Sequence, residues 1–120
     1  MNQSVVTVEP EASVAQSAAL MVRARVGSAI VLQGSFLAGI LTERDVLRAA
    51  ASGADLTASP VRDWMTAHPE SAGPEATADE AAELMLRGGF RHLPILDGRR
   101  VCGVVSLRDL FAARIRRPAT

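Results

Sequence analysis

The sequence of 120 residues contains no lysine or tyrosine, a single cysteine and very few aromatic residues. Because Cys102 is the only cysteine, an intrachain disulfide and a thiolate metal cluster are excluded. Its place in an apolar stretch predicts a small buried side chain. Aromatic residues make up 3% of the chain. A stacking surface for single-stranded nucleic acid needs more of them, so the composition argues against one.

The chain also lacks a net charge and long hydrophobic runs. Its 13 basic residues, all arginine, balance 13 acidic residues, which leaves no basic excess for general nucleic-acid binding. No apolar run approaches the roughly 18 residues of a membrane-spanning helix. The first residues lack the basic region and apolar core of a signal peptide. We therefore expect a cytoplasmic protein with neither nucleic acid nor a membrane as a partner.

What the sequence does contain is an internal repeat. Shifting the chain by 64 residues aligns residues 10–50 with residues 74–114 without a gap, and 13 of these 41 positions are identical. The identical pairs include glycines, apolar positions and an aspartate near the end of each copy. A chance alignment would not preserve these three kinds of position together, so the chain is a tandem duplication.

Each copy predicts the same order of elements, β-α-β-β-α. The first helix of each copy opens at Ser13 or Thr77, which are good N-caps, and the pair Gly88-Gly89 is typical of a helix end. Glycines at 34 and 98 indicate two hairpin turns. A polar linker joins the copies and is followed by an expected helical turn at residues 61–66. The expected strands are residues 5–8, 29–32 and 37–41 in the first copy, and the region around 71, 93–96 and 101–105 in the second.

A copy of this size is only marginally stable by itself, because a domain of about 60 residues buries only ~60% of its unfolded surface. We therefore expect an α/β (α+β) fold in which the two pseudo-symmetric β-α-β-β-α motifs pack sheet-to-sheet as one module. The linker divides the chain into a first domain, residues 1–58, and a second, residues 59–120. Packing of this kind leaves clefts between the copies, where small ligands favour binding.

One motif recurs where the last strand of each copy meets the closing helix, as GILTERD at residues 39–45 and GVVSLRD at residues 103–109. In the structural interpretation, Thr42 and Asp45, or Ser106 and Asp109, form a helix-capping box that needs no ligand. In the functional interpretation, the helix N-terminus attracts an anion and the carboxylate accepts ribose hydroxyls. The motif alone favours the cap, and both interpretations remain open at this point.

The repeat adds a resemblance to a known family. Tandem β-α-β-β-α copies that end in Gly-apolar-apolar-Thr/Ser-x-x-Asp resemble a pair of CBS domains, the modules named after cystathionine β-synthase. The segment GFRHLPI at residues 89–95 is similar to that family's entry into its second strand. The resemblance spans about residues 5–115. It implies a regulatory module that binds AMP, ADP, ATP or S-adenosylmethionine, needs no obligatory cofactor, forms a homodimer and acts on an unidentified protein partner.

The resemblance also assigns residues to two ligand sites. In each site the Asp of one copy holds ribose and the Ser or Thr beside it approaches phosphate. Residues that enter the same copy's second strand also reach phosphate, while the other copy surrounds the adenine. The first site comprises Asp109, Ser106, Arg91 and His92, with an adenine wall of Ala12, Ser17, Val26, Gly27 and Ser28. The second site comprises Asp45 and Thr42, with Ala76, Ala81 and Phe90.

The two sites are expected to differ in affinity. The positions of Arg91 and His92 are taken in the first copy by Gly27 and Ser28, which carry no charge. Charge-assisted hydrogen bonds are roughly twice as strong as neutral ones, so tighter binding is expected at Asp109 and a weak or empty site at Asp45. A different hypothesis is a dimerisation or protein-interaction module whose motifs are only helix caps. No metal cluster or nucleophile elbow is apparent, so an enzyme is not expected.

Overall fold

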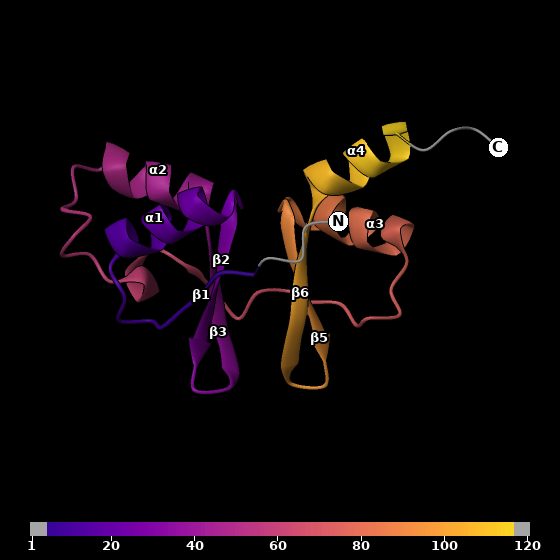
Figure 1. The fold of residues 1–120 in the computed structure, drawn as a ribbon, viewed down its shortest axis with the longest axis horizontal. Coiled ribbons are helices and arrows are strands. Elements are labelled where there is room, and N and C mark those ends of the chain that lie inside the picture. Colours follow the sequence, from indigo (N-terminus) through magenta and orange to yellow (C-terminus); the bar gives the residue numbers. More distant parts are fainter. Residues whose placement is uncertain (1–4, 117–120) are drawn as a thin grey trace. The chain divides into compact units, whose positions relative to one another are not determined.

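The computed structural model describes residues 5–116, with side chains described up to residue 112. The chain divides into two compact units, unit 1 (Met1–Pro69) and unit 2 (Glu70–Thr120), and each is described by itself. Figure 1 draws unit 1 in indigo to magenta and most of unit 2 in orange to yellow. Both units combine helices and strands, which confirms the predicted α/β class.

Unit 1 contains a four-stranded sheet in the order β1-β2-β3-β4, with two helices that contact each other on one side of it (Figure 1). Strands β1 and β2 are parallel, and the other neighbours are antiparallel. Its elements are β1 (Thr7–Val8), α1 (Val14–Ala24), β2 (Ser28–Gln33), β3 (Phe36–Thr42), α2 (Glu43–Ala51), the 3-10 helix η1 (Val61–Asp63) and β4 (Thr66–Ala67).

Unit 2 repeats the central part of this arrangement around one antiparallel hairpin. Ser28 pairs with Thr42 in the first hairpin, and His92 pairs with Ser106 at the equivalent point of the second. Both hairpins carry a register shift at equivalent positions, and the counterpart of β1 is a single parallel bridge made by Ala72. The predicted hairpins are therefore confirmed. Unit 2 consists of α3 (Ala78–Gly88), β5 (His92–Asp97), β6 (Arg100–Ser106) and α4 (Leu107–Arg116).

The helix ends follow the capping residues that the sequence predicts. The Ser13 hydroxyl accepts from the backbone N–H of the third helical residue, and Thr77 forms a full capping box with Glu80. Gly89 ends α3 with φ 75°, a left-handed conformation that glycine adopts without steric cost. The equivalent end of α1 is made by Arg25 at φ 60°, so this turn tolerates a side chain in the first copy.

Each unit has its own hydrophobic core. In unit 1 the buried side chains come from both helices, the sheet and η1, and Trp64 packs against them. In unit 2 the core centres on Met85 and Leu93, with Ala81 beside them. Cys102 is exposed, so its predicted burial is wrong. It lies on the face of β6 opposite to Val105, which packs against the unit 2 core, and an apolar stretch in the sequence does not indicate which face of a strand the core covers.

The segment after the linker packs on unit 1 rather than on unit 2. The backbone N–H of Val61 donates to Ala12 O (2.8 Å), Val14 N–H donates to Ser59 O (2.9 Å), and β4 pairs with β3. The expected helical turn is present as η1. The chain therefore passes from unit 1 to unit 2 after Pro69, eleven residues beyond the domain boundary that the linker composition indicates.

Gly39 shows why this segment can approach β3 so closely. A Cβ at Gly39 would lie 2.5 Å from Met65 Sδ and 2.7 Å from the backbone oxygen of Thr66. At the equivalent position of the second copy, a Cβ at Gly103 would meet nothing within 4 Å. The glycine shared by both motifs therefore has a packing role in the first copy only.

Replacing Gly39 by alanine is expected to destabilise the protein by about 1–3 kcal/mol, because the β4 backbone must move. Gly103→Ala is the matched control and is expected to change the free energy of unfolding by less than about 0.5 kcal/mol. Urea unfolding followed by circular dichroism measures both effects. Equal destabilisation by the two substitutions would contradict a specific contact at Gly39.

Candidate functional site

The two recurring motifs form strand-to-helix junctions of the same construction. The first backbone N–H of the closing helix donates to the residue that precedes the central hairpin. Glu43 N–H donates to Gly27 O (3.0 Å) in unit 1, and Leu107 N–H donates to Arg91 O (2.8 Å) in unit 2. Each helix N-terminus is thereby held beside the start of the hairpin. Four of the predicted site residues, Ser106, Asp109, Arg91 and His92, are brought to one junction in this way.

At the junction of unit 1, the carboxylate of Asp45 is buried and already hydrogen-bonded. Oδ2 accepts from the backbone N–H of Thr42 (2.9 Å) and from its hydroxyl (3.0 Å), while Asp45 N–H donates to Thr42 Oγ1 (3.3 Å). Oδ1 accepts from Arg48 Nη1 (2.7 Å). Sequence analysis did not single out Arg48, although a basic residue three positions after an acid on a helix is the spacing of an ion pair.

At the junction of unit 2, the same motif makes only one of the two hydrogen bonds of a capping box. Asp109 N–H donates to Ser106 Oγ (3.0 Å), but no described residue donates to the exposed carboxylate of Asp109. The exposed guanidinium of Arg91 has no ion-pair partner among the described side chains. His92 is half-buried and pairs with Ser106 along the hairpin. This junction therefore combines a helix N-terminus, a hydroxyl, a cation and an available carboxylate.

The predicted adenine wall of the first site belongs to unit 1. Ala12 lies half-buried between β1 and α1, and Val26 and Gly27 lie half-buried before β2. Ser28 is buried at the start of β2. Ser17 is fully buried on the same face of α1 as the core residues, and its hydroxyl has no hydrogen-bond partner in the described part of the chain. The role of these residues as an adenine wall stays a prediction.

The residues predicted around the second base belong to unit 2. Ala76 is half-buried just before the N-cap of α3. Ala81 is part of the unit 2 core, and Phe90 packs against that core immediately after α3. Phe90 also lies against Gly88, where an added Cβ would meet its ring at 2.3 Å. Both side chains therefore have a packing role, and their contact with a ligand stays a prediction.

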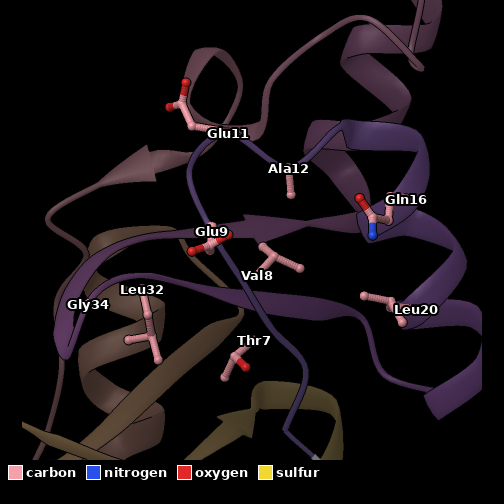
Figure 2. Close-up of a pocket in the computed structure, with 9 residues that line it drawn as sticks. All are labelled: Thr7, Val8, Glu9, Glu11, Ala12, Gln16, Leu20, Leu32 and Gly34. Carbon is pink, nitrogen blue, oxygen red and sulfur yellow. The ribbon is translucent and has the colours of Figure 1, made fainter.

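Unit 1 also contains a pocket of about 550 Å³, shown in Figure 2. Of the predicted site residues only Ala12 lines this pocket. The pocket therefore does not include the strand-to-helix junction of either unit. One of its acidic side chains, Glu11, is paired with Arg62, and this pairing raises the pKa of the Arg62 guanidinium. The pocket is lined by Thr7, Val8, Glu9, Glu11, Ala12, Gln16, Leu20, Leu32 and Gly34.

The described residues offer neither a metal-binding cluster nor a membrane-spanning helix. No group of three or more histidine, cysteine or acidic residues in residues 5–116 could hold a metal ion. Within the same range no helix is both long and apolar enough to cross a membrane. The groups that could bind a ligand at the junctions are therefore hydroxyl, carboxylate, guanidinium and backbone N–H groups.

This geometry can be compared with known proteins. The sequence profile of the CBS domain matches residues 1–52 and 61–116, which is one match for each copy of the repeat. The chain belongs to the CBS domain family. It contains two CBS domains in tandem, and the resemblance noted in the sequence is confirmed.

Similar proteins cover most of the CBS pair. The CBS domain-containing protein YhcV of Bacillus subtilis is 36% identical over 111 residues, which are 92% of this chain and 79% of YhcV. A 17.7 kDa protein of Acidianus ambivalens is 37% identical over 111 residues, and this match spans 91% of the chain and 66% of that protein.

Solved structures agree with the fold. A protein with CBS domains from Burkholderia ambifaria superimposes with a TM-score of 0.89 at 32% identity, over 99% of this chain and 89% of the other. A CBS domain protein from Pyrobaculum aerophilum, solved in complex with AMP, has a TM-score of 0.83 at 26% identity. That match covers 91% of this chain and 85% of the other.

Proposed function

We propose that this CBS pair is a cytoplasmic, non-catalytic regulatory module that binds an adenosine-containing ligand. The observation that carries the proposal is the junction of unit 2. The exposed carboxylate of Asp109 there accepts no hydrogen bond from a described residue, and Leu107 N–H at the start of α4 donates to the backbone oxygen of Arg91, whose guanidinium has no ion-pair partner among the described side chains. A ligand that has both a diol and an anionic group fits these two side chains, because the diol can donate to the carboxylate and the anion can pair with the guanidinium. A nucleoside phosphate is such a ligand.

The ribose and the phosphate of a nucleoside phosphate each have a proposed counterpart at this junction. The Asp109 carboxylate is an acceptor for the two ribose hydroxyls, as the acidic residue of dinucleotide-binding folds is. The Ser106 hydroxyl and the Arg91 guanidinium are proposed as the donors for phosphate at the N-terminus of α4. His92 lies next to Arg91 and completes the phosphate side. The residues of the predicted adenine wall are proposed to enclose the base.

The similarity to the AMP complex from P. aerophilum supports this class of ligand. AMP, ADP and ATP share the adenosine and at least one phosphate, and S-adenosylmethionine shares the adenosine. Binding would shift an equilibrium between conformations or assemblies only as far as the ligand prefers one state. The proposed output is therefore a change of shape or assembly that a second protein recognises.

Isothermal titration of AMP, ATP and S-adenosylmethionine into the purified protein tests the function. We expect AMP to bind at one principal site per chain with a micromolar dissociation constant. Adenosine serves as a control that lacks the anion. Arg91→Ala is expected to weaken AMP about 10-fold, the loss of one charge-assisted contact, while leaving adenosine unchanged. Absence of heat with every ligand, in a folded protein, would refute nucleotide binding.

A specific observation also favours self-association. Among the side chains that the structure describes, four large apolar ones are exposed on the helices, and they occupy equivalent positions in the two repeats: Val22 and Leu86 on the first helix of each copy, Leu47 and Phe111 on the closing helix. An exposed apolar patch is typical of an interaction site, and in each unit both helices supply exposed apolar side chains. We propose that these helix faces form the contact of a homodimer, whether or not the chain binds a nucleotide.

Light scattering is expected to give the mass of a dimer for the native chain. Combining Val22→Glu with Leu47→Glu is expected to give a monomer, because two carboxylates cannot be buried in a symmetric apolar contact. Phe36→Glu is the matched control, since Phe36 is an exposed apolar residue at the hairpin turn and not on a helix. A native monomer, or a dimer that survives the double substitution, would contradict this interface.

A further inference from the structure

The strand-to-helix junction of unit 1 differs from that of unit 2 by an additional cation. Arg48 lies three residues after Asp45 on α2 and donates from Nη1 to Asp45 Oδ1 (2.7 Å). The other carboxylate oxygen, Oδ2, accepts from the backbone and the hydroxyl of Thr42. Both oxygens of Asp45 are therefore engaged before any ligand arrives.

Arg48 is held in this position from a second direction. Its guanidinium carbon lies 5.7 Å from the centre of the Trp64 ring, within the range of a cation–π contact. Trp64 itself packs against the unit 1 core. A guanidinium that leaves Asp45 would also leave this ring, so two interactions oppose its displacement.

The second repeat has no counterpart of this arrangement. A shift of 64 residues places Ala112 at the position of Arg48. Alanine has no charged group, and the carboxylate of Asp109 is exposed without a donor from the described residues. One difference between the engaged and the available carboxylate is therefore the cation three residues later on the closing helix, which only the first repeat has.

We propose that Arg48 occupies Asp45 in place of ribose hydroxyls and so keeps the Thr42/Asp45 junction closed to nucleotides. This inference rests on the proposed function, in which the aspartate of the motif receives ribose. In the hydrogen bond from the guanidinium both partners are charged, whereas in a bond from a ribose hydroxyl to the same oxygen only the carboxylate is charged. Arg48 is thus a specificity-determining residue that leaves one of two similar junctions open.

Removal of Arg48 is expected to free the Asp45 carboxylate for a ligand while leaving the helix cap of the junction intact. The capping box between Thr42 and Asp45 involves Oδ2 and does not depend on Arg48. Oδ1 would then have both lone pairs available for the 2′ and 3′ hydroxyls. The Asp45 side chain is only 8% exposed while the Arg48 side chain above it is 56% exposed, so loss of the guanidinium uncovers the carboxylate rather than the core.

The test is the stoichiometry of AMP binding by isothermal titration. The native chain is expected to bind one AMP, Arg48→Ala two, and the double variant Arg48→Ala/Asp45→Ala one again. Arg48→Gln keeps the helix and most of the side-chain volume, and is a second variant in case alanine impairs folding. Arg44→Ala removes another exposed arginine of α2 that has no ion-pair partner in the described residues, and it should leave one AMP per chain.

The outcomes separate this inference from the proposed function. One AMP for the native chain and one for both Arg48 variants would overturn the inference alone. No AMP for the native chain, but one for Arg48→Ala that is lost with Asp45→Ala, would support the inference and refute the Asp109 site. Two equal sites in the native chain, or no binding by any variant, would also overturn the inference. A second bound AMP in Arg44→Ala would likewise overturn the inference, because it would show that charge on α2 acts without contact to Asp45.

Discussion

Asp109→Ala is expected to weaken AMP binding by about 100-fold or more, the largest effect that the structure leads us to expect. Hydrogen bonds to a charged group each contribute about 1.5–3 kcal/mol, and the carboxylate is assigned two of them, to the 2′ and 3′ hydroxyls of ribose. Two such bonds correspond to a change of at least about two orders of magnitude in the dissociation constant. Isothermal titration of AMP measures the effect directly.

The same titration includes its own matched control. Asp45 occupies the equivalent position in the first repeat, but its carboxylate is already engaged by Thr42 and Arg48. Asp45→Ala is therefore expected to change the AMP affinity less than about 3-fold, provided that the variant is folded. Normal affinity in Asp109→Ala, or a severe loss in Asp45→Ala alone, would show that the two junctions have been assigned the wrong roles.

The second large effect concerns stability, and here Asp45→Ala is expected to have a larger effect than Asp109→Ala. Asp45→Ala is expected to lower the free energy of unfolding by about 2–3 kcal/mol, because it removes the side-chain half of a capping box and leaves the Thr42 N–H without its acceptor. The pair with Arg48 adds little to this figure, since the guanidinium side chain is largely exposed and solvent screens the contact. Asp109→Ala loses no hydrogen bond of its carboxylate to a described residue and is expected to cost less than about 1 kcal/mol.

Urea unfolding of the two variants measures this difference. Trp64 is the only tryptophan and lies in unit 1, so its fluorescence reports on the unit that contains Asp45. Circular dichroism provides a second probe that does not depend on the contact between Arg48 and the Trp64 ring. Equal losses of stability in Asp45→Ala and Asp109→Ala would contradict the view that one motif is a closed cap and the other is not.

Much of the fold could be predicted because the relevant signals are local. The helix starts at Ser13 and Thr77, the left-handed end at Gly89 and the hairpin turns at Gly34 and Gly98 all follow from the conformational preferences of single residues. The internal repeat supports these predictions, because an element predicted in one copy is expected at the equivalent position of the other. The CBS family followed from the same pattern and is confirmed by the sequence profile.

Other features depended on contacts between distant residues. Val61 and β4 pack on unit 1, although composition places them beyond the linker, because their backbone groups find partners at Ala12 and on β3. Cys102 is exposed because the core covers only one face of its hairpin. An apolar run in the sequence does not indicate how many of its faces will be covered.

The amino-acid sequence alone determined the duplication, the order of elements and the two Thr/Ser-x-x-Asp motifs, since all of these are encoded in spacing and residue type. It could not distinguish the two motifs by the state of their carboxylates. That distinction depended on where a guanidinium lies in space: Arg48 sits on α2 between Asp45 and the Trp64 ring, and Ala112 leaves Asp109 without such a partner. Hydrogen-bond partners are selected by distance and burial, and these exist only once the chain has folded.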